Sequence, residues 1–278
     1  AVKSGKQVYA FIEVKARFDE EANLRWGEQL EKAGIVVRYS FPGLKVHSKL
    51  ALVRRLEPDG PQLYSYLSTG NFHEVTARIY SDQGLFTSDK RITSEVARIF
   101  SFLETVKLPS EEFKHLLVGQ FNLRKTLIQL IDFEIAEAGA GRPASIVLKI
   151  NSLQDEEMIE KLYAASHAGV KIELNIRGIC SLIAGKKSLS ENIKAFSIVD
   201  RFLEHSRIFL FHHGGQEKMY LASADWMERN LSFRIETAFP IYDPVLMAEI
   251  KDILAIQRSD NVKARSLNYQ HINEYLLN

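Results

Sequence analysis

The sequence predicts an α/β protein made of two related domains, and two observations support this class. Segments rich in β-branched and aromatic residues alternate along the chain with segments of helical periodicity. The order strand, Asp-Glu-Glu, helix, Ala-Gly, strand occurs twice, with acidic triplets beginning at Asp19 and Asp155. Any two strand–helix–strand units can share this order, so the repeat alone leaves a true duplication open. Since 278 residues suit two domains, we expect domains at residues 1–114 and 115–278, each a mixed sheet flanked by helices.

The first domain is expected to begin with a buried strand at residues 7–14, which are rich in β-branched and aromatic side chains. The triplet at Asp19 then begins a helix that ends near Gly34, because carboxylates stabilise the positive end of a helix dipole. The remaining elements of this half are expected as strands at residues 35–39, 45–55 and 62–68 and a helix at residues 88–105.

The second domain is expected to open with an amphipathic helix at residues 123–138. Its apolar side chains recur at helical spacing, at Leu127, Ile128, Ile131 and Ile135. The later elements are expected as strands at residues 145–150 and 170–175 and a helix at residues 155–168.

Charge and composition limit the kinds of partner. The 36 Lys and Arg residues nearly balance the 35 Asp and Glu residues, which gives a net charge of +1. This balance argues against a broadly basic surface that coats DNA, so we expect no nucleic-acid partner. A polyanion would have to bind at a local patch. No run of about 18 apolar residues is present, so we expect no transmembrane segment.

The single cysteine, Cys180, permits no internal disulfide and no cysteine-based zinc site. This usage is typical of a reducing compartment, and we expect a cytoplasmic protein, with a peripheral position at the inner membrane as a further option. The chain does not begin with Met, and residues 1–5 resemble the end of a helix. We therefore expect it to start within a longer protein.

Two histidines in matching positions of the two halves are the main candidates for chemistry. His47 is followed two positions later by Lys49, and His205 by Arg207. Alternation along a strand would place each histidine and its cation on one face. A nucleophilic imidazole beside a cation is suited to phosphoryl transfer, since the nitrogen attacks phosphorus while the cation holds the phosphate oxygens.

Each histidine motif is followed by a segment of small polar residues. These segments are Ser-Thr-Gly-Asn-Phe at residues 68–72 and Ala-Ser-Ala-Asp-Trp at residues 222–226. One His-x-Lys motif alone is common by chance and usually marks a half-exposed strand. A pair in matching halves, each with this continuation, is much rarer and favours a true duplication.

The duplicated motif resembles the phospholipase D superfamily, and longer segments resemble the polyphosphate kinase family within it. The resemblance covers the two C-terminal catalytic domains of that family and runs nearly end to end. It is carried by the segments EVKARFDE at residues 13–20, STGNFH at 68–73, NIRGIC at 175–180, LSEN at 189–192, RFLEHSRI at 201–208 and DNVKAR at 260–265.

The resemblance implies reversible transfer of the ATP γ-phosphate to inorganic polyphosphate through a phosphohistidine at His47. A phosphoramidate keeps a high transfer potential, which suits a reversible reaction. In the family's pattern His205 is the second histidine, an acid/base group or γ-phosphate contact. The ATP-contacting positions match Tyr80, Arg177 and His205. Expected partners are therefore ATP, ADP and polyphosphate, with a homo-oligomer for the full-length protein.

Other family positions are expected to bind phosphate. The family's Mg²⁺ site includes an arginine that matches Arg17, but a guanidinium has no lone pair to donate. We therefore interpret Arg17 as a phosphate contact beside Mg²⁺, the expected cofactor. Lys49 and Arg207 would clamp the transferring phosphate and Asn71 would donate a hydrogen bond. Asp225 is interpreted as a turn residue or as a group that orients a histidine.

Two alternatives remain at this point. One is a phosphodiesterase or nuclease of the phospholipase D superfamily. That motif needs an aspartate seven residues after each histidine, where this chain has Arg54 and His212. The other is an inactive fragment that only binds polyphosphate or nucleotide.

Overall fold

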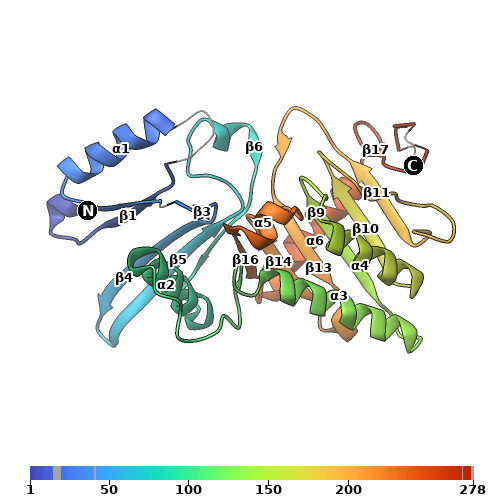
Figure 1. The fold of residues 1–278 in the computed structure, drawn as a ribbon, viewed down its shortest axis with the longest axis horizontal. Helices are drawn as coiled ribbons and strands as arrows, with labels where there is room; N and C mark the ends of the chain where they lie inside the picture. The colour runs from blue at the N-terminus through green and yellow to red at the C-terminus, as the bar shows by residue number, and fades with distance from the viewer. Residues whose placement is uncertain (15–19, 41, 271, 277–278) are drawn as a thin grey trace.

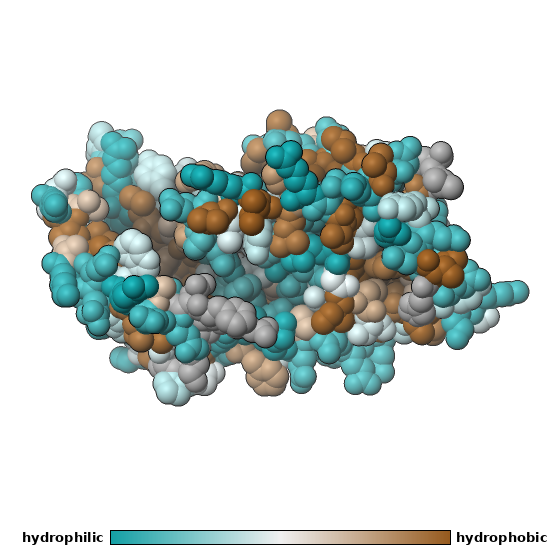
Figure 2. All heavy atoms as spheres, turned by 90° about the horizontal axis from the view of Figure 1, so that it is seen from above, coloured by the Kyte–Doolittle hydropathy of each residue, from teal (hydrophilic) through white to brown (hydrophobic). Residues whose placement is uncertain are grey.

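The computed structural model describes residues 1–14, 20–40, 42–270 and 272–276 of the chain. It shows two α/β halves side by side, with the larger sheet in the second half (Figure 1). Most of the face in Figure 2 is hydrophilic, with small scattered hydrophobic patches, as expected for the surface of a folded protein. Within the described residues, no helix is long and apolar enough to cross a membrane.

The first half contains two small sheets. Strands β1 and β2 are parallel, and strands β4, β5 and β7 form an antiparallel sheet. In chain order the elements are η1 (Val2–Ser4), β1 (Tyr9–Ile12), α1 (Glu20–Lys32), β2 (Val36–Tyr39), β3 (Lys45–Val46), β4 (Lys49–Glu57), β5 (Gly60–Ser68), η2 (Thr76–Arg78), β6 (Tyr80–Ser81), β7 (Gly84–Thr87) and α2 (Lys90–Thr105).

The second half is built on one eight-stranded mixed sheet of order β17-β11-β10-β9-β13-β14-β16-β8. Strands β9, β10 and β11 are parallel to each other, and the other pairs are antiparallel. The elements are β8 (Leu117–Val118), α3 (Leu123–Gly139), β9 (Ser145–Ile150), α4 (Glu156–His167), β10 (Lys171–Ile176), β11 (Ile193–Ser197), β12 (Leu203–Glu204), β13 (Arg207–Phe211), η3 (His213–Gly215), β14 (Lys218–Ala222), α5 (Glu228–Ser232), β15 (Arg234–Ile235), β16 (Thr237–Pro240), α6 (Pro244–Arg258) and β17 (Arg265–Ser266).

Aspartate caps explain where three of the helices begin. The carboxylates of Asp89, Asp155 and Asp243 accept hydrogen bonds from backbone N–H groups in the first turns of α2, α4 and α6. Each bond satisfies a donor that the helix itself leaves unpaired. Pro244 follows Asp243 at the first helical position, where its fixed φ angle is compatible with the helix. The predicted start of α4 at the acidic triplet of Asp155 is thus confirmed.

The predicted α/β class is confirmed, but several details differ from the expectation. The strand expected to be buried at residues 7–14 is shorter, at Tyr9–Ile12, and its residues are exposed or half-buried. The strand expected at residues 45–55 is interrupted at His47 and Ser48, between β3 and β4. The first half has two separate sheets in place of one mixed sheet. Just after β1, the Glu13 carboxylate accepts hydrogen bonds from Val46 N and Ser40 Oγ. The expected helix start at Asp19 lies outside the described residues.

The two halves repeat the same order of elements. In the first half β1-α1-β2-β3-β4-β5-β6-β7-α2 follows the same path as β9-α4-β10-β12-β13-β14-β15-β16-α6 in the second, where β11 is additional. Short parallel pairs then cross between the halves, because β3 pairs with β15 and β6 pairs with β12. Each crossing pair therefore contains one short strand from each half, in an approximately two-fold arrangement.

The core is organised around both faces of the large sheet. One cluster of buried apolar residues lies within the second half, among α3, α4 and the sheet. The other cluster contains residues of both halves, including Leu67 and Val96 of the first and Ile208 and Phe239 of the second. Because this second cluster is shared, the two halves are expected to unfold together.

A leucine truncation in the first half tests this coupling. Leu67→Ala removes a fully buried side chain from the shared cluster and is expected to lower the free energy of unfolding by about 2–5 kcal/mol. In a Trp26→Phe background, the fluorescence of the buried Trp226 reports unfolding of the second half. Leu67→Ala should lower its denaturation midpoint, whereas the control Leu56→Ala, at an 82% exposed position, should not. An unchanged Trp226 midpoint in Leu67→Ala would show that the halves unfold separately.

Candidate active site

His47 lies between β3, which pairs with β15 of the second half, and β4, which belongs to a sheet of the first half. The backbone N–H groups of His47 and Ser48 both donate to the carbonyl of Ile235, just after β3 ends its pairing with β15. The Nδ1 atom of His47 lies 2.9 Å from the carboxylate of Glu236, which is fully buried. The carboxylate favours the tautomer with its proton on Nδ1, so Nε2 keeps its lone pair.

His205 has the same arrangement with the two halves exchanged. The N–H groups of His205 and Ser206 donate to the carbonyl of Ser81, just after β12 ends its pairing with β6. Its Nδ1 atom lies 2.8 Å from the Asp82 carboxylate. Each histidine is therefore held by a carboxylate that belongs to the other half of the chain.

The small polar segments hold these carboxylates in place. Thr69 Oγ1 donates to Asp82 at 2.7 Å, and Ser223 Oγ donates to Glu236 at 2.5 Å. The next residue in the first segment is Gly70, where an added Cβ would lie 2.0 Å from the Asp82 carboxylate. The hydroxyl is therefore required as a donor, and the glycine is required so that the carboxylate can approach the backbone.

Two buried cations accompany the histidines. Lys49 is 5% exposed and its Nζ donates to the carbonyl of His47 at 2.5 Å. Arg207 is 4% exposed, donates to the carbonyl of His205 at 2.7 Å and forms an ion pair with Asp225 at 3.1 Å. Each side chain folds back on its own histidine, which fixes the charge close to the imidazole ring.

Burial controls protonation at this site. Burial lowers the pKa of His47 by more than the Glu236 carboxylate raises it. The charges of Lys49 and Arg207 lower this pKa further. The pKa of His205 is also lowered, mainly by burial, against the effect of its bonded carboxylate. Burial lowers the pKa of Lys49 to about 8. Since Arg207 acts on both histidines, the two motifs form one electrostatic unit, with neutral imidazoles at pH 7.

Two expected nucleotide contacts also lie beside His205. The ring of Tyr80, in β6, lies 4.9 Å from the imidazole of His205, measured between centroids. Arg177 follows β10 and its Nε donates to Asn151 Oδ1. The amide nitrogen of Asn151 in turn donates to the carbonyl of His205 at 3.3 Å. Tyr80, Arg177 and His205 are thus brought to the same side of the site.

Other expected residues are placed differently. Asn71 is exposed, whereas its counterpart Asp225 accepts hydrogen bonds from Arg207 and from the backbone of Asn151. Asp225 therefore orients the cation and not a histidine ring. Arg17 lies outside the described residues.

The positions where the phospholipase D motif has aspartates also lie away from the histidines. Arg54 is an exposed residue of β4, and His212 follows β13, where its ring accepts from Gly215 N. Neither position supplies a carboxylate.

Several residues of the site were not foreseen from the sequence. The two carboxylates follow their own halves' histidines by 35 residues (Asp82) and 31 residues (Glu236), a similar spacing that is a usable signal once the duplication is accepted. Behind His205, the buried Lys149 forms an ion pair with Glu204 at 3.1 Å and donates to Ser206 Oγ at 2.8 Å. The sequence places Lys149 in the strand expected at residues 145–150 and gives no signal of these contacts.

The described carboxylates of the site do not form a metal cage. Within the ranges that the structure describes, no group of three His, Cys, Asp or Glu side chains is placed to hold a metal ion. Each carboxylate already has a partner within the protein. The pairs are Asp82 with His205, Glu236 with His47, Asp225 with Arg207 and Glu204 with Lys149. A Mg²⁺ ion held by several protein carboxylates does not fit this arrangement.

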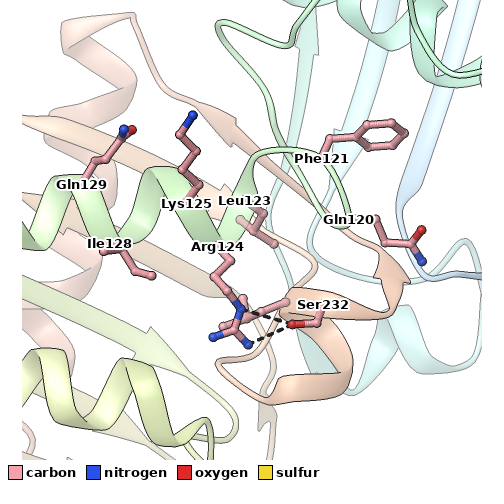
Figure 3. A pocket seen from close by; sticks show the side chains of 9 residues that line it. Gln120, Phe121, Leu123, Arg124, Lys125, Ile128, Gln129 and Ser232 are labelled. Atoms are coloured by element: carbon pink, nitrogen blue, oxygen red, sulfur yellow. Dashed lines mark hydrogen bonds between the residues drawn. The ribbon is translucent and has the colours of Figure 1, made fainter.

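A pocket of about 510 Å³ lies elsewhere, between the start of α3 and α5 (Figure 3). Arg124 points into it and is already engaged, because it donates to Ser232 and forms ion pairs with Asp155 and Glu157. The charge of Arg124 at the start of α3 is therefore neutralised within the protein.

The paired halves, in which His47 is followed by Lys49 and His205 by Arg207, define an α/β protein of two related halves that share one candidate site. Two family models match the chain, polyphosphate kinase C-terminal domain 1 at residues 1–109 and polyphosphate kinase C-terminal domain 2 at residues 116–277. The chain belongs to the polyphosphate kinase family.

Individual relatives agree with this assignment. Proteins named polyphosphate kinase from Salmonella typhimurium and Escherichia coli K12 are each 48% identical over 276 residues, which make up 99% of this chain and 40% of each relative. The chain therefore spans about two fifths of the length of these curated relatives.

Solved structures show the same fold. Polyphosphate kinase from Porphyromonas gingivalis matches with a TM-score of 0.91 and 47% identity, over 99% of this chain and 42% of that chain. Phosphatidylserine synthase from Haemophilus influenzae shares the fold alone, with a TM-score of 0.64 and 10% identity, over 96% of this chain and 76% of that chain.

An isosteric substitution tests the carboxylate at His205. The Asp82 carboxylate raises the pKa of His205 against the larger effect of burial, so Asp82→Asn is expected to lower that pKa further. NMR titration of the His205 ring measures the change. The control Glu217→Gln removes a partly exposed carboxylate that pairs with Lys251 and should leave the His205 titration unchanged. A rise in the His205 pKa on Asp82→Asn would contradict the described contact.

Proposed function

We propose that this chain is the catalytic part of a polyphosphate kinase, which transfers the ATP γ-phosphate reversibly to inorganic polyphosphate through phospho-His47. The observation that supports this most directly is the placement of the His47 ring, which is bonded to Glu236 through Nδ1 and accompanied by two buried cations. A second support is the 48% identity to proteins named polyphosphate kinase.

In the first step, His47 Nε2 attacks the γ-phosphorus and forms a P–N bond. The bond from this phosphorus to the bridging oxygen breaks and its electron pair leaves with ADP. The imidazole becomes cationic while Glu236 accepts a hydrogen bond from its Nδ1 proton, which stabilises the charge. Lys49 and Arg207 lie close enough to neutralise the oxygens of a phosphoryl group in transit.

In the second step, a terminal phosphate oxygen of polyphosphate attacks the same phosphorus. The P–N bond breaks, its electron pair returns to Nε2, and His47 becomes neutral again. A phosphoramidate has a transfer potential comparable to that of a phosphoanhydride, so neither direction is strongly favoured. No proton has to leave Nδ1 in the cycle, because the same hydrogen bond to Glu236 serves both states of the ring.

The side of the site beside His205 is proposed to bind the nucleotide. The Tyr80 ring offers an aromatic face, and Arg177 offers a cation held by Asn151. His205, bonded to Asp82, would contact the γ-phosphate or give a proton to the leaving oxygen. Asn71, exposed beside the glycine of its segment, is a secondary candidate for a phosphate hydrogen bond.

Mg²⁺ is proposed to arrive bound to the nucleotide phosphates, since the described carboxylates are bonded to the site's own side chains. Arg17 is proposed as a phosphate contact beside that ion. Because ATP is the donor, we further propose a cytoplasmic protein. For the full-length protein we propose a homo-oligomer without a nucleic-acid partner.

The proposed nucleophile is tested by labelling the chain with γ-³²P ATP. We expect acid-labile, base-stable label on the chain and complete loss of this label in His47→Ala. The control His167→Gln changes an exposed histidine at the end of α4 and should label normally. Label that persists in His47→Ala would exclude His47 as the nucleophile. An unlabelled chain that still binds polyphosphate would favour the binding fragment, and release of nucleotides from DNA would favour the nuclease.

The pH dependence provides a second test. Burial lowers the His47 pKa from 6.5, so the acid limb of kcat/KM for labelling should lie below pH 6.5. Burial lowers the Lys49 pKa to about 8, so loss of its charge should produce an alkaline limb near pH 8. Lys49→Arg keeps the charge at high pH and should remove this limb, although the rate itself will change. An alkaline limb that remains near pH 8 in Lys49→Arg would rule out Lys49 as its source.

A further inference from the structure

Arg234 occupies the same place beside His47 that Tyr80 occupies beside His205. In the parallel pair β15·β3, Arg234 lies opposite Lys45, two residues before His47. In the pair β12·β6, Tyr80 lies opposite Leu203, two residues before His205. The two-fold relation between the halves therefore makes Arg234 the counterpart of Tyr80.

Strand alternation directs the Arg234 side chain to the site. Ile235 is fully buried in the shared apolar cluster, so its neighbours on either side point the opposite way. Glu236 is one of these neighbours, and its carboxylate contacts His47. Arg234 shares that face. In the other half, Tyr80 and Asp82 share a face in the same way, and both contact His205.

The charge of Arg234 is available for a ligand. Within the described ranges, its guanidinium forms no hydrogen bond and no ion pair. By contrast, Arg207 is paired with Asp225 and Arg124 with Asp155. Arg234 is partly buried, and its charge is close enough to lower the pKa of Lys49. A desolvated guanidinium next to a lysine is a strong binding group for phosphate oxygens, which it contacts through two parallel N–H donors.

The two sides of the site thus differ in chemistry. An aromatic ring stands beside His205, which suits a nucleoside, and a guanidinium stands beside His47, which suits a second anion. We propose that Arg234 binds the terminal phosphate of the acceptor polyphosphate next to His47. This inference rests on the function proposed above and names the side of the site from which the acceptor chain approaches.

The experiment compares two ligands in two variants. Arg234→Gln should weaken equilibrium binding of polyphosphate to the 278-residue chain by about tenfold and change ATP binding much less. Tyr80→Ala should show the reverse pattern. Arg229→Gln, which removes the same charge from the exposed end of the neighbouring helix α5, should change neither by more than about twofold. Arg234→Lys should recover part of the polyphosphate affinity, because the charge remains while the paired donors are lost.

Transfer kinetics give an independent readout. In Arg234→Gln, the rate at which labelled chain passes its phosphoryl group to polyphosphate should fall by about tenfold relative to the rate of labelling by ATP. Circular dichroism and the melting temperature confirm that the variants are folded. Equal loss of ATP and polyphosphate binding, or no loss of either, would overturn the inference. A chain that ATP does not label would instead overturn the proposed function, while the binding comparison would still decide the role of Arg234.

Discussion

The site depends on two short parallel strand pairs that cross between the halves. The pairs β3·β15 and β6·β12 contain only two residues per strand, so their own hydrogen bonds contribute little stability. Their effect is positional, because they place Glu236 against His47 and Asp82 against His205. Neither half alone holds a histidine together with its carboxylate. The site therefore requires both halves docked together, and the shared apolar cluster maintains that docking.

The electrostatics of the site follow from this docking. The net charge of the whole chain is only +1. The site nevertheless contains two cationic side chains, Lys49 and Arg207, that are almost completely buried. Burial disfavours their charge and that of an imidazolium, so the free site is poised to gain stability when a polyanion enters. Asp225 and Glu236 offset part of the cost of burial. This balance explains how a nearly neutral protein can have a locally cationic site.

The two halves share the hydrogen bonds that position the histidines and their carboxylates, but they differ in other side chains of the site. Thr69 and Ser223 donate to equivalent carboxylates, and the carbonyls of Ser81 and Ile235 accept from equivalent backbone pairs. Groups that set the frame are thus chemically conserved between the halves. Groups that face a ligand differ, as in Lys49 against Arg207. A two-fold frame with unlike contacts suits the proposed reaction, in which a phosphoryl group moves between two different partners.

Local rules were sufficient for much of the fold and for the histidine motifs. Periodicity predicted α3, β9 and α4, and acidic caps predicted the start of α4, because these features depend on neighbours within a few residues. The paired motifs predicted His47, Lys49, His205 and Arg207 as candidate site residues for the same reason. The partners Glu236 and Asp82 were not predicted, and neither was the break between β3 and β4. Those features depend on contacts across 189 and 123 positions of sequence. The sequence by itself therefore determined which groups are candidates for chemistry, and only the tertiary structure decided which carboxylate lies against which histidine, since strand exchange between the halves leaves no local pattern.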